Sequence, residues 1–273
     1  IWAAGDSQTR GFLIGATSGR TTLNGEGLQH QDGHSHILSS TIPNCLSYDP
    51  AYAYELAIIF KDGIQKMFVE QQNYYYYITV TNENYEQPEQ PKGIEEDVIK
   101  GLYKVSGCED PDIRLIGSGS ILKESLLAKE MLKKHSIDAE VWSATSFNLL
   151  RKDGMEAERH NQLNPHKAPL VTHLDKCFGN KDIPVVASTD YMRAYADQIR
   201  PYINSSYAVL GTDGFGRSDS REELRDFFEI SANHIMRVTA YSLYKESKIS
   251  KEALDAIYKE VKVDPSKPNP WEV

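Results

Sequence analysis

The sequence predicts an α/β protein in two parts, the second of which contains a mainly parallel sheet. Two observations favour this fold class. The chain has 273 residues, more than the roughly 100–200 that a single domain usually holds. Strand-like and helix-like segments also alternate through its second half, and this alternation is typical of βαβ units.

The first part begins with residues 1–27, which are rich in Gly, Ser and Thr around the apolar patch at 12–14. Such composition predicts loops and no regular element. Residues 51–70 carry apolar side chains at steps of three and four, which predicts an amphipathic helix. The almost wholly aromatic and β-branched residues 74–81 predict a buried strand.

Residues 82–93 contain Pro88 and Pro91 among acidic and amide side chains, so we expect an exposed linker. This segment predicts a first domain at 1–90 and a second at 91–273. The second domain should contain strands at 113–116, 140–144, 185–187 and 207–210 and helices at 121–134, 191–202, 221–228, 231–245 and 250–261.

Composition excludes several classes of protein. The 30 basic and 39 acidic side chains give a net charge of −9, which disfavours nucleic acid and anionic membranes as partners. Three cysteines without a CxxC pair indicate neither a disulfide framework nor a thiolate zinc site, and favour a cytoplasmic setting. No apolar run approaches the roughly 18–20 residues that span a bilayer. The start at Ile1 suggests a piece of a longer protein.

Three histidines, His30, His34 and His36, lie close together around Gly33. Such density suggests a zinc or iron site, although Gly33 argues against the helical geometry of HExxH motifs. One of these histidines could instead be a catalytic acid, base or hydrogen-bond donor, because its pKa is near neutrality. A hydrogen-bonded loop is the third interpretation. Glu26 lies four residues before His30 and could position the same loop.

Two glycine-rich stretches are candidate phosphate sites. Residues 117–120 (GSGS) follow a strand and open a helix, but lack the complete GxGxxG or P-loop pattern, so a tight turn is favoured. Residues 213–221 end in a capping-box pattern that begins at Ser220. Arg217 and Arg221 remain candidates for binding a carboxylate or phosphate, or for a subunit interface.

Longer strings carry a resemblance to a known family. They are TTLNGEGLQHQDGHSH at 21–36, IPNC at 42–45, YDPAYAYE at 48–55, ASTDYM at 187–192 and LGTDGFGRSDSR at 210–221. Together they resemble the C-terminal part of the homodimeric decarboxylating components of bacterial pyruvate dehydrogenase complexes. The stretch at 25–31 also resembles a loop of transketolases in which a histidine faces the substrate.

The resemblance implies the end of a pyrimidine-binding α/β domain followed by a transketolase-type C-terminal domain. It implies thiamine diphosphate and magnesium as cofactors, but their binding motifs would precede Ile1, so no cofactor or metal ligand is assigned here. His30 matches a catalytic histidine and Glu26 a nearby acidic residue, whereas His34 and His36 match without a role. The implied reaction decarboxylates pyruvate from glycolysis and reductively acetylates a lipoyl group.

The implied partners are pyruvate, a lipoyl-bearing dihydrolipoyl acetyltransferase component and a second copy of the protein. The chain alone is expected to be inactive. Two alternatives stay open at this point. The chain could be an interaction or dimerisation module, or a metal-dependent enzyme that uses His30, His34 and His36.

Overall fold

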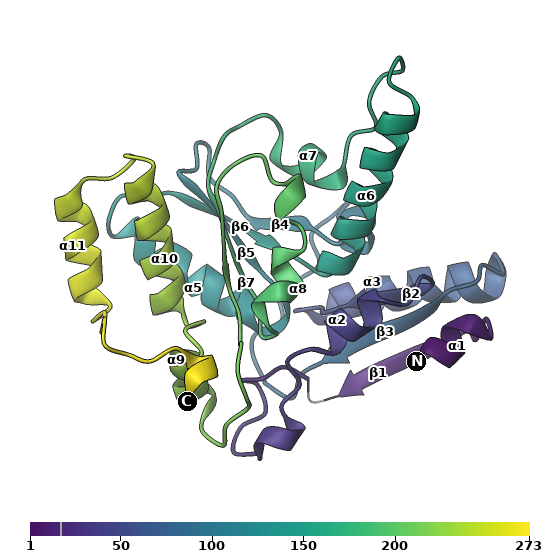
Figure 1. Cartoon of the computed structure of the whole chain (residues 1–273), viewed down its shortest axis with the longest axis horizontal. Helices are drawn as coiled ribbons and strands as arrows, with labels where there is room; N and C mark the ends of the chain where they lie inside the picture. Colours follow the sequence, from purple (N-terminus) through teal and green to yellow (C-terminus); the bar gives the residue numbers. More distant parts are fainter. Residues whose placement is uncertain (17) are drawn as a thin grey trace.

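Two separate sheets organise the chain (Figure 1). The computed structural model describes residues 1–16 and 18–273. The first sheet has three strands in the order β1-β3-β2, and the second has five in the order β4-β6-β5-β7-β8. The strands are β1 (Phe12–Ala16), β2 (Cys45–Tyr48), β3 (Tyr75–Val80), β4 (Tyr103–Ser106), β5 (Ile113–Gly117), β6 (Ala139–Ser143), β7 (Val185–Ser188) and β8 (Tyr207–Leu210).

In the first sheet, β3 is the central strand and pairs in parallel with both neighbours. Its tyrosines Tyr75 and Tyr76 are buried, so the predicted buried strand is confirmed. The predicted helix is confirmed as α3 (Ala53–Ile64), which continues into a π-helical turn at Gln65–Val69.

The expectation of loops throughout 1–27 is wrong. This segment contains the short helix α1 (Trp2–Asp6) as well as β1. β1 lies at the edge of its sheet with Leu13 and Ile14 exposed, and it is only five residues long. Its strand conformation depends on pairing with β3, a partner more than sixty positions away that local periodicity does not reveal.

The second sheet confirms the predicted mainly parallel arrangement. β5, β6, β7 and β8 pair in parallel, and only β4 runs antiparallel, against β6. The helices are α2 (Ser35–Ser40), α4 (Glu95–Lys100), α5 (Leu122–Lys133), α6 (Phe147–Leu163), α7 (His173–Phe178), α8 (Arg193–Asp197), α9 (Arg221–Phe227), α10 (Ala232–Lys245) and α11 (Lys251–Glu260).

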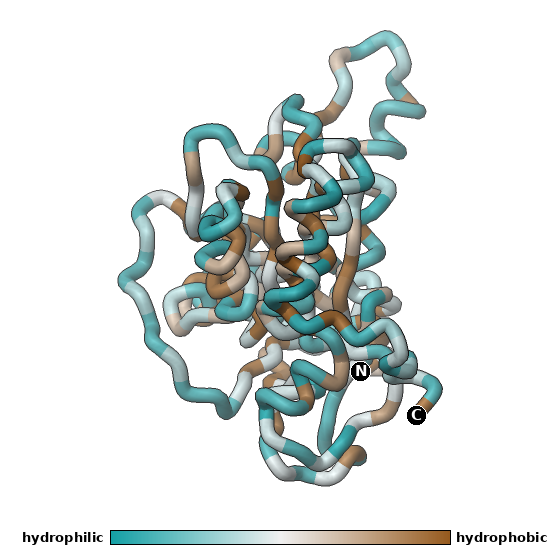
Figure 2. The backbone as a smooth tube through the Cα atoms, turned by 90° about the vertical axis from the view of Figure 1, so that its left-hand side faces the viewer, coloured by the Kyte–Doolittle hydropathy of each residue, from teal (hydrophilic) through white to brown (hydrophobic). Residues whose placement is uncertain are grey.

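Helices cover both faces of the second sheet. The side chains of one face join a core with α5, α10 and α11, and those of the other face pack with α6, α7 and α8. Neighbouring residues of β5 illustrate this alternation, because Leu115 belongs to the first core and Ile116 to the second. Figure 2 shows apolar backbone segments inside the molecule and hydrophilic loops around it.

Two expectations in the second half need correction. Residues 191–202 form the short helix α8 and a separate 3-10 turn at Arg200–Tyr202, not one helix. Pro201 explains the break, since proline disfavours a helical residue before it and lacks an amide hydrogen. The segment 82–93 is exposed from residue 86 onward, but the Glu83 side chain is only 7% exposed and pairs with Arg225. This segment is therefore anchored at its start.

Candidate functional site

The chain that leaves β1 crosses from the first sheet to the carboxyl end of β7 in the second. There the Thr21 amide and hydroxyl donate to the Asp190 carboxylate at 3.0 and 2.7 Å. The Arg20 amide also donates to the Asp190 carbonyl oxygen at 3.1 Å. Burial raises the pKa of Asp190 to about 6. The start of the histidine-bearing loop is thus fixed to the second sheet.

A second anchor holds the middle of this loop against residues 211–220. The Gln31 side chain is only 5% exposed, accepts from the Arg217 amide at 2.7 Å and donates to the Arg217 carbonyl oxygen at 2.5 Å. A methyl group on Gly216 would lie 2.6 Å from Gln31 Oε1. The Gly25 amide donates to the Asp219 carbonyl oxygen at 2.9 Å. The two loops therefore support each other.

His30 and Glu26 lie between these anchors, in or near a 3-10 turn at Leu28–His30. Both side chains are exposed. The backbone around them is held, since the His30 amide donates to the Gly27 carbonyl oxygen at 3.0 Å and the Glu26 carbonyl accepts from the Ser218 hydroxyl. A backbone fixed in this way can present a side chain to a molecule outside the chain.

The three histidines do not converge on a metal. His36 is buried in α2, where its Nε2 lies 3.0 Å from Thr79 Oγ1 and its ring stacks on Tyr195. Burial lowers the pKa of His36 to about 3, so it is neutral. His34 and His30 are exposed. Across residues 1–16 and 18–273, no group of three or more His, Cys, Asp or Glu side chains could hold a metal ion. The metal-site interpretation is wrong.

A buried carboxyl that the sequence analysis did not single out lies between the two sheets. Asp49 follows β2 and accepts from the Thr79 hydroxyl at 2.8 Å. Gly119 has a φ of +49°, and a methyl group there would lie 2.6 Å from Asp49 Oδ2. Burial raises the pKa of Asp49 to about 7. The glycine-rich stretch at 117–120 thus accommodates this side chain, in agreement with the favoured tight turn.

The arginines of the second glycine-rich stretch contact the protein itself. Arg221 Nε donates to the Thr22 carbonyl oxygen at 2.7 Å, and the Arg217 guanidinium lies 4.3 Å from the centre of the Phe227 ring. Ser220 accepts from the Glu223 amide at 3.2 Å, so the predicted cap of α9 is confirmed. Arg221 therefore joins the start of α9 to the histidine-bearing loop, and Arg217 packs the glycine-rich stretch against α9.

One cysteine lies close to a base. Cys177 Sγ is 3.4 Å from His173 Nε2, because the two residues are one helical turn apart in α7. The thiolate is the nucleophilic form of cysteine. Burial raises the pKa of Cys177 to about 12. This pair therefore gives no activated nucleophile.

Comparison with known proteins adds independent evidence. Residues 1–88 match the family model of the pyruvate dehydrogenase E1 component middle domain. Residues 101–231 match the model of the transketolase-like TK C-terminal domain. In the described part of the chain, no helix combines the length and apolar character that a membrane span requires.

Curated relatives match along nearly the whole chain. The pyruvate dehydrogenase E1 component of Cupriavidus necator is 48% identical over an alignment of 277 positions that covers 100% of this chain and 31% of that protein. The pyruvate dehydrogenase E1 component of Escherichia coli K12 is 53% identical over 275 residues, covering 98% of this chain and 31% of that protein. The chain thus spans about a third of the length of these relatives.

Solved structures show the same fold at low identity. A transketolase mutant from Pichia stipitis superposes with a TM-score of 0.65 at 17% identity, over 89% of this chain and 32% of the other. Transketolase from Leishmania mexicana gives a TM-score of 0.62 at 17% identity, over 84% of this chain and 30% of the other.

Fold and matched models together define a transketolase-like α/β protein. The high identity along the chain then makes the assignment more specific. The chain belongs to the family of the pyruvate dehydrogenase E1 component.

Proposed function

We propose that this chain is the part of a thiamine diphosphate-dependent pyruvate dehydrogenase that supplies the catalytic histidine. The complete protein decarboxylates pyruvate and reductively acetylates a lipoyl group of a dihydrolipoyl acetyltransferase component. The names of the relatives support this proposal, as does the exposed His30 on a loop fixed at both ends. We also propose domains at 1–90 and 91–273, a homodimer and a cytoplasmic location.

The side chains of this chain can be compared with the ligands that the cofactor requires. No cluster of metal ligands exists among the described residues, whereas a magnesium diphosphate needs oxygen ligands to the metal. His30 and Glu26 are exposed and have no hydrogen bond or ion pair from their side chains within the described chain. These residues suit one wall of a site whose metal and diphosphate ligands lie outside this chain.

When bound, thiamine diphosphate supplies the carbon nucleophile for the reaction. The protein's own contribution at His30 is a hydrogen-bond donor at the oxygen of the former ketone, where negative charge develops. Removal of one such donor typically lowers turnover by about 10²–10³-fold. Glu26 belongs to the same loop, and we propose that it positions His30 or the substrate.

The test is His30→Ala in the complete protein. Turnover should fall by about 10²-fold with little change in cofactor affinity, because the lost interaction is one made to the reacting group. The measurements are steady-state kinetics and calorimetric titration with thiamine diphosphate and magnesium.

His34→Ala is the matched control, because His34 is also exposed and directly precedes α2. Its turnover should stay near the wild-type value. Wild-type turnover in His30→Ala, or an equal loss in both variants, would contradict the role of His30.

Titration of the present chain with thiamine diphosphate and magnesium, alone and mixed with the remainder of the protein, tests the division of the site. Cofactor binding by this chain alone would overturn it.

A further inference from the structure

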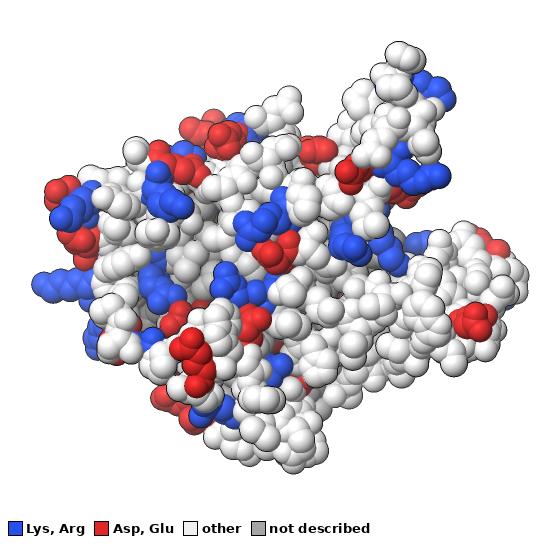
Figure 3. Space-filling view, in the orientation of Figure 1, with Lys and Arg blue, Asp and Glu red and all other residues white. Residues whose placement is uncertain are grey.

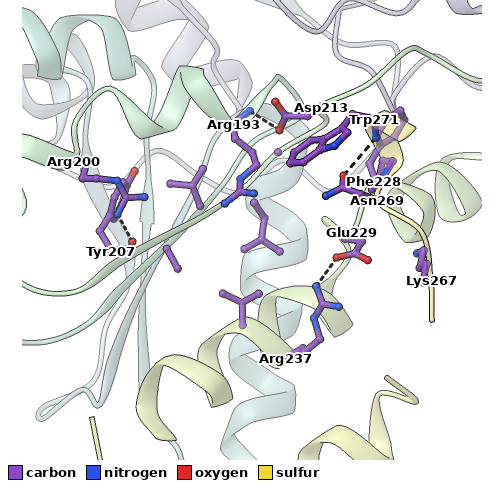
Figure 4. A pocket seen from close by; sticks show the side chains of 16 residues that line it. Arg193, Arg200, Tyr207, Asp213, Phe228, Glu229, Arg237, Lys267, Asn269 and Trp271 are labelled. Atoms are coloured by element: carbon purple, nitrogen blue, oxygen red, sulfur yellow. Dashed lines mark hydrogen bonds and ion pairs between the residues drawn. The ribbon is translucent and has the colours of Figure 1, made fainter. Parts of the chain in front are cut away.

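A hollow of about 470 Å³ lies along β8, the edge strand of the second sheet. Helix α10 and the C-terminal residues 267–271 form its other walls (Figure 4). Small-molecule sites typically have volumes of about 300–1,000 Å³, so this hollow is large enough for a ligand. None of the residues proposed above for catalysis lines it.

Basic side chains outnumber acidic ones in the lining although the whole chain carries a net charge of −9. Four cationic groups face two acidic ones, which are Asp213 and Glu229. Figure 3 shows blue side chains of this kind on the face seen in Figure 1. The four cationic residues are Arg193, Arg200, Arg237 and Lys267.

Three of these cations already have carboxylate partners. Arg237 pairs with Glu229 at 2.6 Å, Arg200 with Asp197 at 2.5 Å and Lys267 with Asp226 at 3.3 Å. These pairs fix the side chains around the hollow but leave little unsatisfied charge.

Arg193 differs from the other three. Its backbone amide donates to Asp213 Oδ2 at 3.2 Å, but its guanidinium has no ion pair within the described part of the chain. Figure 4 shows this guanidinium directed into the hollow, between Arg200 and Trp271. A guanidinium presents paired donors that match a phosphate or carboxylate.

The C-terminal wall of the hollow contributes an aromatic side chain, Trp271, whose backbone is held in place. Trp271 is 55% exposed and belongs to a 3-10 turn at Pro270–Glu272. The backbone of this turn packs against Gly214, which has a φ of +115° and at which a methyl group would lie 2.7 Å from the Pro270 carbonyl oxygen. An exposed indole beside a cationic group suits a ligand that joins a flat ring to an anion.

We propose that this hollow binds a small molecule that carries a phosphate group and a planar ring, with the phosphate at Arg193 and the ring against Trp271. The inference rests on the hollow alone and does not depend on the proposed pyruvate dehydrogenase function.

The test is calorimetric titration of the chain with adenosine 5′-monophosphate, ribose 5-phosphate and inorganic phosphate as probes. One adenosine 5′-monophosphate should bind per chain and change the tryptophan fluorescence. The two probes without a ring should bind more weakly, and added salt should weaken all three because an exposed charge is screened.

Arg193→Gln should weaken binding of all three probes by about tenfold, as expected when one charge-assisted hydrogen bond is lost. Arg159→Gln is the matched control, because Arg159 is an exposed arginine on α6, remote from the hollow in sequence and absent from its lining. Trp271→Leu should abolish the preference for adenosine 5′-monophosphate over ribose 5-phosphate. Circular dichroism checks that each variant is folded.

Three results would overturn the proposal. The first is the absence of saturable binding by every probe up to millimolar concentration. The second is an equal loss in Arg193→Gln and Arg159→Gln, which would indicate attraction by the general surface charge. The third is binding that neither Arg193→Gln nor Trp271→Leu alters.

Discussion

At the scale of single residues, Asp49 shows that the contact between the two sheets changes the pKa of a side chain. The sequence places it between a strand and a proline, where an aspartate usually suits a turn. In the folded protein it is buried against Thr79 of the first sheet and against Ser118 and Gly119, which follow β5 of the second sheet. Asp190 and Glu55 also act on its charge. Burial above all, with a smaller contribution from the neighbouring acids, raises its pKa to about 7.

The pKa of Asp49 predicts a dependence of stability on pH. In the unfolded chain the carboxyl titrates near its ordinary value of about 3.9, whereas the folded value is about 7. Between the two values the folded protein retains a proton that the unfolded chain has released. The stabilising contribution is therefore complete below about pH 4 and is lost as the pH rises through about 7.

Asp49→Asn should remove this dependence, because an amide does not titrate. From about pH 4.5 to 7.5, the free energy of unfolding of the variant should rise relative to that of the wild type, by at most about 1.4 kcal/mol per pH unit. Urea unfolding at several pH values measures it. The control is Asp255→Asn, an exposed position on α11. Parallel pH profiles of wild type and Asp49→Asn would refute the prediction.

Short residue patterns predict contacts between residues that are close together in the sequence. The cap at Ser220 was predicted because one short motif contains both partners. The exposure of His30 and the burial of His36 were not predictable, since both lie in one histidine-rich stretch and differ only in their tertiary neighbours. Gln31 was also missed, because its partner Arg217 lies 186 positions later.

At the scale of elements, the segment 82–93 does more than link the two sheets, because its start is held by ion pairs. Glu83 is buried with Arg225 and also pairs with Lys123 of α5. Although burial opposes the charged form, these two cations hold the pKa of Glu83 below its ordinary value. The composition of 82–93 predicted exposure correctly for most positions, but not which acidic side chain meets a buried arginine.

Glu83→Gln should destabilise the protein by about 3 kcal/mol, because it leaves a buried arginine without its main partner. Denaturant unfolding provides the measurement. Glu86→Gln, an exposed position of the same segment, should change the stability by less than about 0.5 kcal/mol. If the two variants unfold at the same denaturant concentration, the buried pair does not anchor the segment.

Elements with strong periodicity were predicted well. The helices α5, α10 and α11 and the strands β5 to β8 lie where the apolar spacing placed them. Among the elements that were missed, β1 and β4 lie at sheet edges, and α6 contains many polar residues. Their formation depends on neighbours that a local window does not include.

At the scale of the whole molecule, the alternation of strands and helices predicted the parallel sheet but not how the two sheets are joined. Part of the connection consists of hydrogen bonds between residues 20–31 and residues 190–221. Such long-range contacts leave no periodic signal in the sequence.

The loop that carries His30 has a consequence for the order of folding. Its anchors pair residues that are 169 to 199 positions apart, such as Thr21 with Asp190 and Thr22 with Arg221. Contacts of such high sequence separation close large loops of chain and form slowly. We expect the amides of Arg20, Thr21 and Gly25 to become protected from hydrogen exchange only after β5 to β8 have formed.

Pulsed hydrogen exchange during refolding tests this order, with the amides of α10 as an internal reference. Protection of Thr21 before the second sheet would contradict it. During synthesis on the ribosome, almost two hundred further residues must follow the histidine loop before its supports exist. The loop therefore reaches its final conformation only when the larger sheet is essentially complete.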